Sequence, residues 1–313
     1  MGTVYFGVDV GGTTVKIGLF SAEGQLEDKW EIVTRKDNGG KYILGDIAAS
    51  IDAKLQEKNL TKENVGGIGI GIPGPITEDG TVLKCANLGW DVFDVADELS
   101  KLTGIKNVKV GNDANVAALG EMWKGGGKGY KDVIMVTLGT GVGGGVILNG
   151  KILTGSNGAA GEIGHLTVNY DEPDTCGCGK KGCLEQFASA TGIVKQTGRI
   201  LAATDKASKL REMKDFTAKD IFDLAKDGDE LCMESVEELG RYLGIACSHV
   251  AAVVDPQVFV IGGGVSRAGS ILIDVIKKNY ESNVMFALKN KEFKLAELGN
   301  DAGMYGCVKM VLD

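Results

Sequence analysis

The chain of 313 residues carries 42 acidic and 34 basic side chains, which gives a formal net charge of −8 at pH 7. This length allows two domains of ordinary size, and the acidic balance argues against nucleic acid or an anionic membrane as a partner. No apolar run is long enough to span a bilayer, and the N-terminus lacks the basic start and apolar core of a signal peptide. We therefore expect a cytoplasmic protein.

The first predicted element is a β-hairpin close to the N-terminus. An apolar run over 5–10 is followed by a second apolar run over 15–20, and the turn between them reads Gly11-Gly12-Thr13-Thr14. This is the pattern of strand, tight turn and strand. Asp9 stands just before the turn, where its carboxylate either holds a magnesium ion, directly or through water, or caps its own turn.

Helical and strand-like segments alternate over the next hundred residues, as an α/β protein requires. Apolar spacing, β-forming residues and a proline-rich turn identify them. In chain order they are helix 41–58, strand 65–72, turn Pro73-Gly74-Pro75, strand 108–111 and helix 114–124.

A second hairpin of the same form is predicted over 133–148. Its first run ends at Leu138, its turn begins Gly139-Thr140-Gly141, and apolar residues resume over 145–148. Asp9 and Thr137 hold equivalent places in the two hairpins, 128 positions apart (137 − 9). The chain therefore reads as an internal duplication, with two α/β halves.

The second turn also satisfies the dinucleotide fingerprint G-x-G-x-x-G, through Gly139, Gly141 and Gly144. That fingerprint requires a helix to begin directly after the glycines. Here β-forming residues follow instead, and Asn149-Gly150 then signals a further hairpin. We therefore expect the two glycine-threonine turns to face each other across a cleft and to offer backbone N–H groups to a nucleotide triphosphate.

A dense group of metal-binding residue types follows the second hairpin. Glu162 and His165 precede three cysteines and Glu185, and His165 is one of only two histidines in the chain. Three thiolates and one imidazole form a closed tetrahedral set that suits a structural zinc ion. The proposed ligands are His165, Cys176, Cys178 and Cys183. A metal-free reduced cluster and a disulfide stay open as alternatives, although a disulfide is uncommon in a chain without an export signal.

The remaining predicted elements close the second half. In chain order they are helix 229–254, strand 258–261, the turn Gly262-Gly263-Gly264, helix 267–279 and helix 301–312. The glycine turn is expected near the adenosine of the nucleotide. The last helix is expected to return to the first half, which gives predicted domains of 1–117 with 300–313 and of 118–299.

Taken together, these motifs resemble the ROK family of sugar kinases and repressors, and most of all its bacterial glucose-kinase members. The resemblance runs nearly end to end. It rests on Asp9–Lys16, Gly71–Pro75, Asn112–Asn115, Leu138–Gly145, Glu162–His165, Cys176–Cys183 and Ile261–Gly264. It implies an actin-like, ribonuclease-H-like pair of α/β domains around a cleft. The expected activity is ATP-dependent phosphorylation of glucose at its 6-hydroxyl, with Mg²⁺ as catalytic cofactor and Zn²⁺ as structural cofactor.

The resemblance also assigns roles to residues. Asp113 is implied as the general base, although its place before helix 114–124 also suits a helix N-cap. The implied sugar-binding residues are Gly74, Asn87, Asn112, Asp113, Glu162, His165 and Glu185. The implied nucleotide and magnesium residues are Asp9, Gly11, Gly12, Thr13, Thr14, Lys16, Gly139, Thr140, Gly141, Gly263 and Gly264.

Several alternatives remain within the resemblance. N-acetylmannosamine, fructose, mannose or allose is the runner-up substrate, and polyphosphate is a possible donor in place of ATP. A DNA-binding repressor is disfavoured by the acidic charge, by the lack of room for a helix-turn-helix before Val4 and by the presence of Asp113. The family suggests a homodimer or homotetramer.

Overall fold

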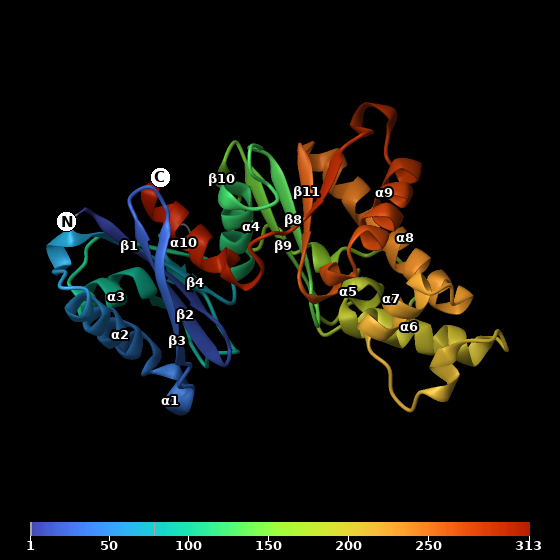
Figure 1. Cartoon of the computed structure of the whole chain (residues 1–313), viewed down its shortest axis with the longest axis horizontal. Coiled ribbons are helices and arrows are strands. Elements are labelled where there is room, and N and C mark those ends of the chain that lie inside the picture. The colour runs from blue at the N-terminus through green and yellow to red at the C-terminus, as the bar shows by residue number, and fades with distance from the viewer. Residues whose placement is uncertain (1, 78) are drawn as a thin grey trace. The chain divides into compact units, whose positions relative to one another are not determined.

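The structure is a computed structural model that describes residues 2–77 and 79–313 (Figure 1). It divides into two compact units. The first comprises the residues up to Lys131, together with Gly145–Gly161 and Leu298–Asp313, and the second comprises Asp132–Gly144 and Glu162–Glu297. The domain ranges that the sequence predicts, 1–117 with 300–313 and 118–299, remain a prediction.

The first unit is built on a five-stranded sheet of order β3-β2-β1-β4-β7. Its strands are β1 Val4–Val10, β2 Thr14–Ser21, β3 Leu26–Val33, β4 Val65–Ile72 and β7 Val108–Asn112. Its helices are α1 Asp37–Gly40, α2 Ile43–Glu57, α3 Val95–Thr103, α4 Asp113–Lys124 and α10 Ala302–Leu312. Shorter pieces are η1 Lys62–Asn64, β5 Thr81–Val82, β6 Phe93–Asp94, β10 Lys151–Ile152 and η6 Gly299–Asp301.

A second five-stranded sheet, of order β10-β9-β8-β11-β12, repeats this plan; β8, β11 and β12 belong to the second unit, and β9 begins in it. Its further strands are β8 Val133–Leu138, β9 Val142–Leu148, β11 Val258–Gly262 and β12 Glu292–Leu295. The helices of the second unit are α5 Glu185–Ala188, α6 Ala190–Ala203, α7 Ala218–Lys226, α8 Glu230–Val254 and α9 Ser270–Asn283. Single turns of 3₁₀-helix are η2 Ile163–His165, η3 Lys209–Glu212, η4 Gly264–Ala268 and η5 Phe286–Leu288.

Strand register confirms the duplication. Asp9 at the end of β1 lies opposite Gly71 of the parallel strand β4. Thr137 near the end of β8 lies opposite Gly262 of the parallel strand β11. The two positions matched by sequence therefore occupy equivalent sites in two sheets of the same topology, and the predicted α/β duplicated fold is confirmed.

Strand β4 shows how period-two alternation separates the two faces of the first sheet. Its isoleucines 68, 70 and 72 are fully buried in the core that also contains α2 and α3. The intervening glycines lie against α10, because a Cβ at Gly69 would stand 1.8 Å from the carbonyl oxygen of Cys307. Side chains of a strand alternate between faces, so the glycines let a helix backbone lie directly on the sheet.

Most predicted boundaries agree with the structure within two or three residues, but two predicted elements differ and α1 was not predicted. The predicted helix 267–279 is interrupted at Gly269, whose φ of 80° ends η4 before α9 begins. Strand β9 starts at Val142 rather than at residue 145. Helix α1 is a left-handed turn missed by the sequence analysis, with φ of 52° at Asn38 and 69° at Gly39.

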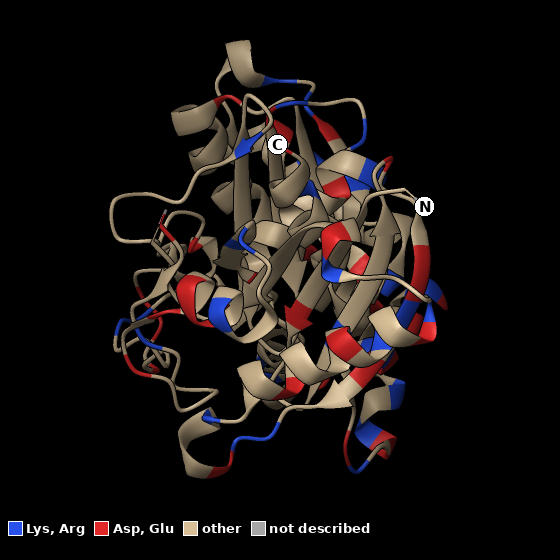
Figure 2. Ribbon diagram, turned by 90° about the vertical axis from the view of Figure 1, so that its left-hand side faces the viewer, with Lys and Arg blue, Asp and Glu red and all other residues tan. Residues whose placement is uncertain are grey.

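The colours of Figure 2 show that acidic and basic residues are interspersed along the chain. One example joins β3 to α2, where Lys54 Nζ lies 3.1 Å from Asp28 Oδ2 and 2.8 Å from Glu57 Oε2. Pairs of this kind at a surface contribute about 0–1 kcal/mol each. Among the described residues, none of the helices combines the length and the apolar character that a membrane span requires.

Candidate functional site

The predicted site residues fall into two sets, one in each unit. The first unit holds Asp9, Gly11, Gly12, Thr13, Thr14, Lys16, Gly74, Asn87, Asn112 and Asp113. The second unit holds Gly139, Thr140, Gly141, Glu162, His165, Cys176, Cys178, Cys183, Glu185, Gly263 and Gly264.

Asp9 lies at the carboxyl end of β1, in register with Lys16 on β2. The pKa of the Asp9 carboxyl is raised to about 6, chiefly by burial; the Lys16 charge opposes this rise and the Asp113 charge contributes to it. On the other side α10 approaches through Gly303, where a Cβ would stand 2.7 Å from Asp9 Oδ2. A carboxylate enclosed in this way favours the approach of a cation.

Hydrogen bonds to backbone groups of the first glycine turn fix its conformation. Gly11 N–H donates to Thr14 O (3.0 Å), and Thr34 donates from its N–H to Thr13 O (2.9 Å) and from its hydroxyl to Gly11 O (2.8 Å). Gly12 and Thr13 are exposed, and no neighbour lies within 4 Å of a Cβ built at Gly12. The tip of the turn is therefore accessible to a ligand.

Asn112 and Asp113 form the junction of β7 and α4. Asn112 is the N-cap, because its Oδ1 accepts from the N–H groups of Ala114 (3.0 Å) and Asn115 (3.1 Å). Its Nδ2 donates to Gly74 O (3.0 Å). Asp113 is thus the first residue of the helix rather than its cap, and its Oδ1 accepts from Ala114 N–H at 2.8 Å. A carboxylate in this position is stabilised by the helix dipole.

Two loops around this junction carry the other predicted residues of the first unit. Gly74 has φ of 102°, and a Cβ there would stand 2.7 Å from Lys84 O, so the position requires glycine. Asn87 is exposed on a loop closed by paired backbone bonds between Cys85 and Trp90 (2.9 and 3.0 Å). Trp90 is buried and fixes this loop to α1 by donating to the carbonyl oxygen of Gly40 at 3.1 Å.

In the second unit the turn after β8 contacts the start of α5 and α6. Ala190 N–H donates to Gly139 O (2.8 Å), and the Thr191 hydroxyl donates to Thr140 O (2.7 Å). Glu185 Oε2 accepts from Val142 N–H at 3.0 Å. A Cβ at Gly141 would stand 2.1 Å from that carboxylate oxygen, so a side chain there would displace Glu185 from Val142.

The turn after β11 lies against the end of β8. Gly263 has φ of 83°, and a Cβ there would stand 2.5 Å from the carbonyl oxygen of Leu138. Gly264, the first residue of η4, has open space around it. The structure therefore brings the predicted adenosine turn next to the residues that begin the second glycine-threonine turn.

The four predicted zinc ligands converge. One donor atom from each of His165, Cys176, Cys178 and Cys183 lies within 4.8 Å of all the others. The Sγ atoms of Cys178 and Cys183 are 3.5 Å apart, and Cys176 Sγ is 3.8 Å from His165 Nδ1. Four ligands at 2.0–2.3 Å from a tetrahedral zinc ion would be separated by roughly 3.5–3.8 Å, so the residues present fit the ion.

The two nitrogens of His165 face different partners. Nδ1 faces the cysteine cluster, whereas Nε2 lies 3.9 Å from Glu162 Oε2. Burial raises the pKa of the Cys183 thiol, and a cation bound among the sulfurs would offset that penalty by stabilising the thiolate. One ring nitrogen is thus available to a metal and the other to the predicted sugar-binding carboxylate.

A group of charged residues next to the cysteine cluster was missed by the sequence analysis. Glu172, Asp174 and Arg199 form hydrogen-bonded ion pairs between the loop and α6. Glu172 and Asp174 precede the first cysteine closely, but no local spacing connects them to an arginine 25 residues or more downstream. The pairing became evident only in the folded chain.

The two units, with equivalent sheets and glycine turns at the ends of β1 and β8, define an actin-like α/β protein of the sugar-kinase class. Comparison with known proteins gives the family. Residues 5–313 match the ROK family, so the chain belongs to it.

Individual relatives agree with this assignment. A glucokinase of Halalkalibacterium halodurans is 44% identical over 96% of this chain and 93% of its own length. The crystal structure of a ROK family glucokinase from Streptomyces griseus, in complex with glucose and AMPPNP, superposes with a TM-score of 0.75 at 32% identity and covers 98% of both chains. A ROK hexokinase from Thermus thermophilus has a TM-score of 0.79 at 29% identity, covering 98% of this chain and 97% of its own.

Proposed function

We propose that this protein is an ATP-dependent hexose kinase that converts glucose to glucose 6-phosphate. The observation that carries the proposal is Asp113, a carboxylate at the start of α4, held beside the capping residue Asn112 and the Gly74 turn. The 44% identical glucokinase and the glucose-bound ROK structure support glucose as the acceptor and ATP as the donor.

In the proposed reaction Asp113 accepts the proton of the sugar 6-hydroxyl. The hydroxyl oxygen forms a bond to the γ-phosphorus, the bond from that phosphorus to the β,γ-bridging oxygen breaks, and ADP leaves with the bridging oxygen. Phosphoryl transfer needs mainly positioning and charge stabilisation from the protein. Asn112 contributes by fixing the backbone from which Asp113 projects.

The proposed sugar site takes one group of residues from each unit. Gly74, Asn87 and Asn112 would contact the sugar from the first unit, and Glu162, His165 and Glu185 from the second. Amide, carboxylate and imidazole groups suit vicinal hydroxyls because each hydroxyl both donates and accepts a hydrogen bond.

The proposed nucleotide site uses both glycine-threonine turns. Backbone N–H groups of Gly11–Thr14 and Gly139–Gly141 would bind the phosphates, with Lys16 nearby and Gly263–Gly264 at the adenosine. Asp9 would hold Mg²⁺, directly or through water. The ion supplies neutralisation of the phosphate charge when it is bound.

The Cys₃His cluster would hold a structural Zn²⁺ that orients His165 toward the sugar. Carboxylate or carbonyl partners on the second nitrogen of a metal-bound histidine set its tautomer and ring orientation. We further propose a homodimer or homotetramer, which light scattering on purified protein would test.

A coupled ADP-release assay tests the function. With ATP and Mg²⁺, kcat/KM should be highest for glucose among glucose, mannose, fructose, allose and N-acetylmannosamine. A higher value for another sugar would change the substrate and leave the mechanism, whereas no turnover with any of the five would reject the kinase proposal. Inorganic polyphosphate in place of ATP tests the donor.

The base role of Asp113 makes a separate prediction. Asp113→Asn should lower kcat by about 10²–10⁴-fold, because a general base contributes that much, while glucose still binds in calorimetry. The matched control is Asp97→Asn, an exposed aspartate in the first turn of α3. Near-normal kcat in Asp113→Asn would remove this residue from the base role.

A further inference from the structure

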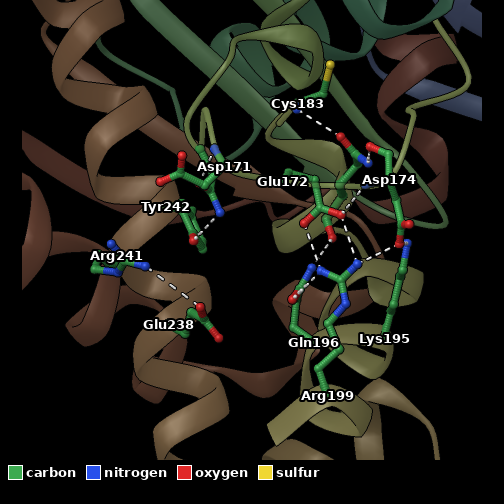
Figure 3. Close-up of polar contacts among 12 residues, drawn as sticks. Asp171, Glu172, Asp174, Cys183, Lys195, Gln196, Arg199, Glu238, Arg241 and Tyr242 are labelled. Atoms are coloured by element: carbon green, nitrogen blue, oxygen red, sulfur yellow. Dashed lines mark hydrogen bonds and ion pairs between the residues drawn. The ribbon is translucent and has the colours of Figure 1, made fainter. Parts of the chain in front are cut away.

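Figure 3 shows a group of charged and amide side chains near Cys183. They connect α6 to the loop that carries Glu172, Asp174 and Cys183. The centre of the group is Glu172, whose side chain is only 2% exposed. Arg199 binds this carboxylate with both arms of its guanidinium, Nη1 to Oε2 at 2.7 Å and Nη2 to Oε1 at 2.8 Å. Arg199 lowers the pKa of the Glu172 carboxyl, so the pair is charged at neutral pH.

The same guanidinium also binds the next acidic residue of the loop. Arg199 Nη2 lies 2.5 Å from Asp174 Oδ2, which also contacts Lys195 Nζ at 2.5 Å. Asp174 N–H in turn donates to Glu172 Oε1 at 3.0 Å. One arginine on a helix therefore fixes both carboxylates and the backbone between them.

Gln186 extends these contacts to the metal ligands. Its Nε2 donates to Asp174 O (2.9 Å), and its Oε1 accepts from the N–H of Cys183 (3.0 Å). Gln186 follows Glu185 directly, and Gln196 on α6 donates to its carbonyl oxygen at 3.2 Å. The chain of contacts thus runs from Arg199 to the backbone of one proposed zinc ligand and to the neighbour of a proposed sugar ligand.

Removal of Arg199 would leave the buried Glu172 carboxylate without its charged partner. A buried carboxylate without its partner must either take up a proton or move to water, and Glu172 can reach water only if the loop leaves α6. Either response releases Asp174 and, through Gln186, the segment that carries Cys183. The bulk of the sheet does not depend on these contacts.

We infer that Arg199 is a positioning residue, which holds the Cys176–Cys183 loop against α6 in the geometry that binds the metal. Its effect on sugar binding, through His165 and Glu185, rests on the proposed function. Its effect on metal retention does not, and the two can be measured separately.

The test compares three variants with the wild type after reconstitution with Zn²⁺. They are Arg199→Met, the conservative Arg199→Lys, and the control Lys278→Met, whose exposed ammonium contacts Glu237 at 2.9 Å between α9 and α8 of the same unit. Zinc release to a chromophoric chelator is followed in native buffer, and circular dichroism checks that each variant is folded. Glucose and ATP KM values are measured in parallel.

Arg199→Met should release zinc about 10–100-fold faster than the wild type, as is typical when a residue that supports metal ligands is lost. Its KM for glucose should rise while its KM for ATP stays within about twofold, because the contacts lead to the proposed sugar ligands. Arg199→Lys should be intermediate, since lysine keeps the charge but not the bidentate geometry. Lys278→Met should match the wild type in every measurement.

Unchanged zinc release in a folded Arg199→Met variant would overturn the inference, as would failure of the wild type to bind Zn²⁺. If Arg199→Met does not fold, the charge-neutral pair Glu172→Gln with Arg199→Met replaces it, because no buried charge is then left unpaired. That pair should still release zinc faster. A wild type that retains zinc but phosphorylates no hexose would reject the proposed function and leave the positioning role standing.

Discussion

The buried Asp9 carboxylate lowers the stability of the folded chain and has a proposed role in catalysis, and its titration separates the two effects. Its carboxyl has a pKa of about 6 in the folded chain, against an ordinary value of 3.8. Below about pH 4 the group is protonated in both states and costs nothing. Between pH 4 and 6 only the unfolded chain ionises, so stability falls as pH rises, and above about pH 6 the full cost is present.

Asp9→Asn should therefore stabilise the ligand-free protein at pH 8 by about 1–3 kcal/mol and leave it nearly unchanged at pH 4. Urea unfolding midpoints at the two pH values measure this difference. The variant should lose kinase activity because its amide cannot hold Mg²⁺ as a carboxylate does. Equal midpoints for the variant and the wild type at pH 8 would show that burial does not raise the pKa of Asp9.

At the scale of elements, α10 is placed by glycines on both sides of the contact. It lies against β4 at Gly69 and against α4, where a Cβ at Gly306 would stand 1.6 Å from Val116 O. On α4 a Cβ at Gly120 would stand 2.1 Å from Ala302 O. Neither backbone can yield without separating the two helices, so their close approach depends on the absence of side chains.

Gly306→Ala should destabilise the protein by about 1–3 kcal/mol or more, the range for an added methyl group in a well-packed interior. The matched control is Gly45→Ala on α2, where no neighbour lies within 4 Å of the added Cβ. That control should gain about 0.5–1 kcal/mol from helix propensity. Thermal and urea unfolding of the two variants give the comparison, and similar stability for both would contradict the packing argument.

At the scale of the whole molecule, the first unit is completed by the end of the chain. Leu298–Asp313 belongs to the same unit as the N-terminal sheet, although the second unit lies between them in sequence. Helix α10 covers β1 and β4 through the close contacts of Gly7 and Gly69. The first unit therefore cannot bury this face of its sheet until the last residues are available.

A chain that ends at Glu297 should lose hydrogen-exchange protection throughout β1, β2 and β4, because the face covered by α10 becomes exposed to water. Protection in β8, β11 and α8 should persist, since these elements form the second unit. Mass spectrometry of exchanged peptides from the truncated and full-length proteins makes the comparison. Preserved protection in β1 and β4 would show that the first unit is stable without α10.

Local patterns predicted the strands and the longest helices well. Strand β4 and strand β8 have the predicted bounds, and α8 begins at Glu230, one residue from its predicted start. These segments have long apolar periodicity, which depends only on neighbouring residues. By contrast α1 is a left-handed turn of Asp37–Gly40 that lies against the Asn87 loop, and no periodic pattern marks it.

The sequence by itself determined the duplicated α/β plan, the two glycine-threonine turns and the four residues of the cysteine–histidine cluster, because each shows in the spacing of residues along the chain. Only the tertiary structure decided that Asn112 rather than Asp113 caps α4, that His165 turns Nδ1 toward the sulfurs, and that Arg199 pairs with Glu172. These features depend on the direction of side chains and on contacts between distant segments. Burial and charge pairing fix them, and both arise only when the chain is folded.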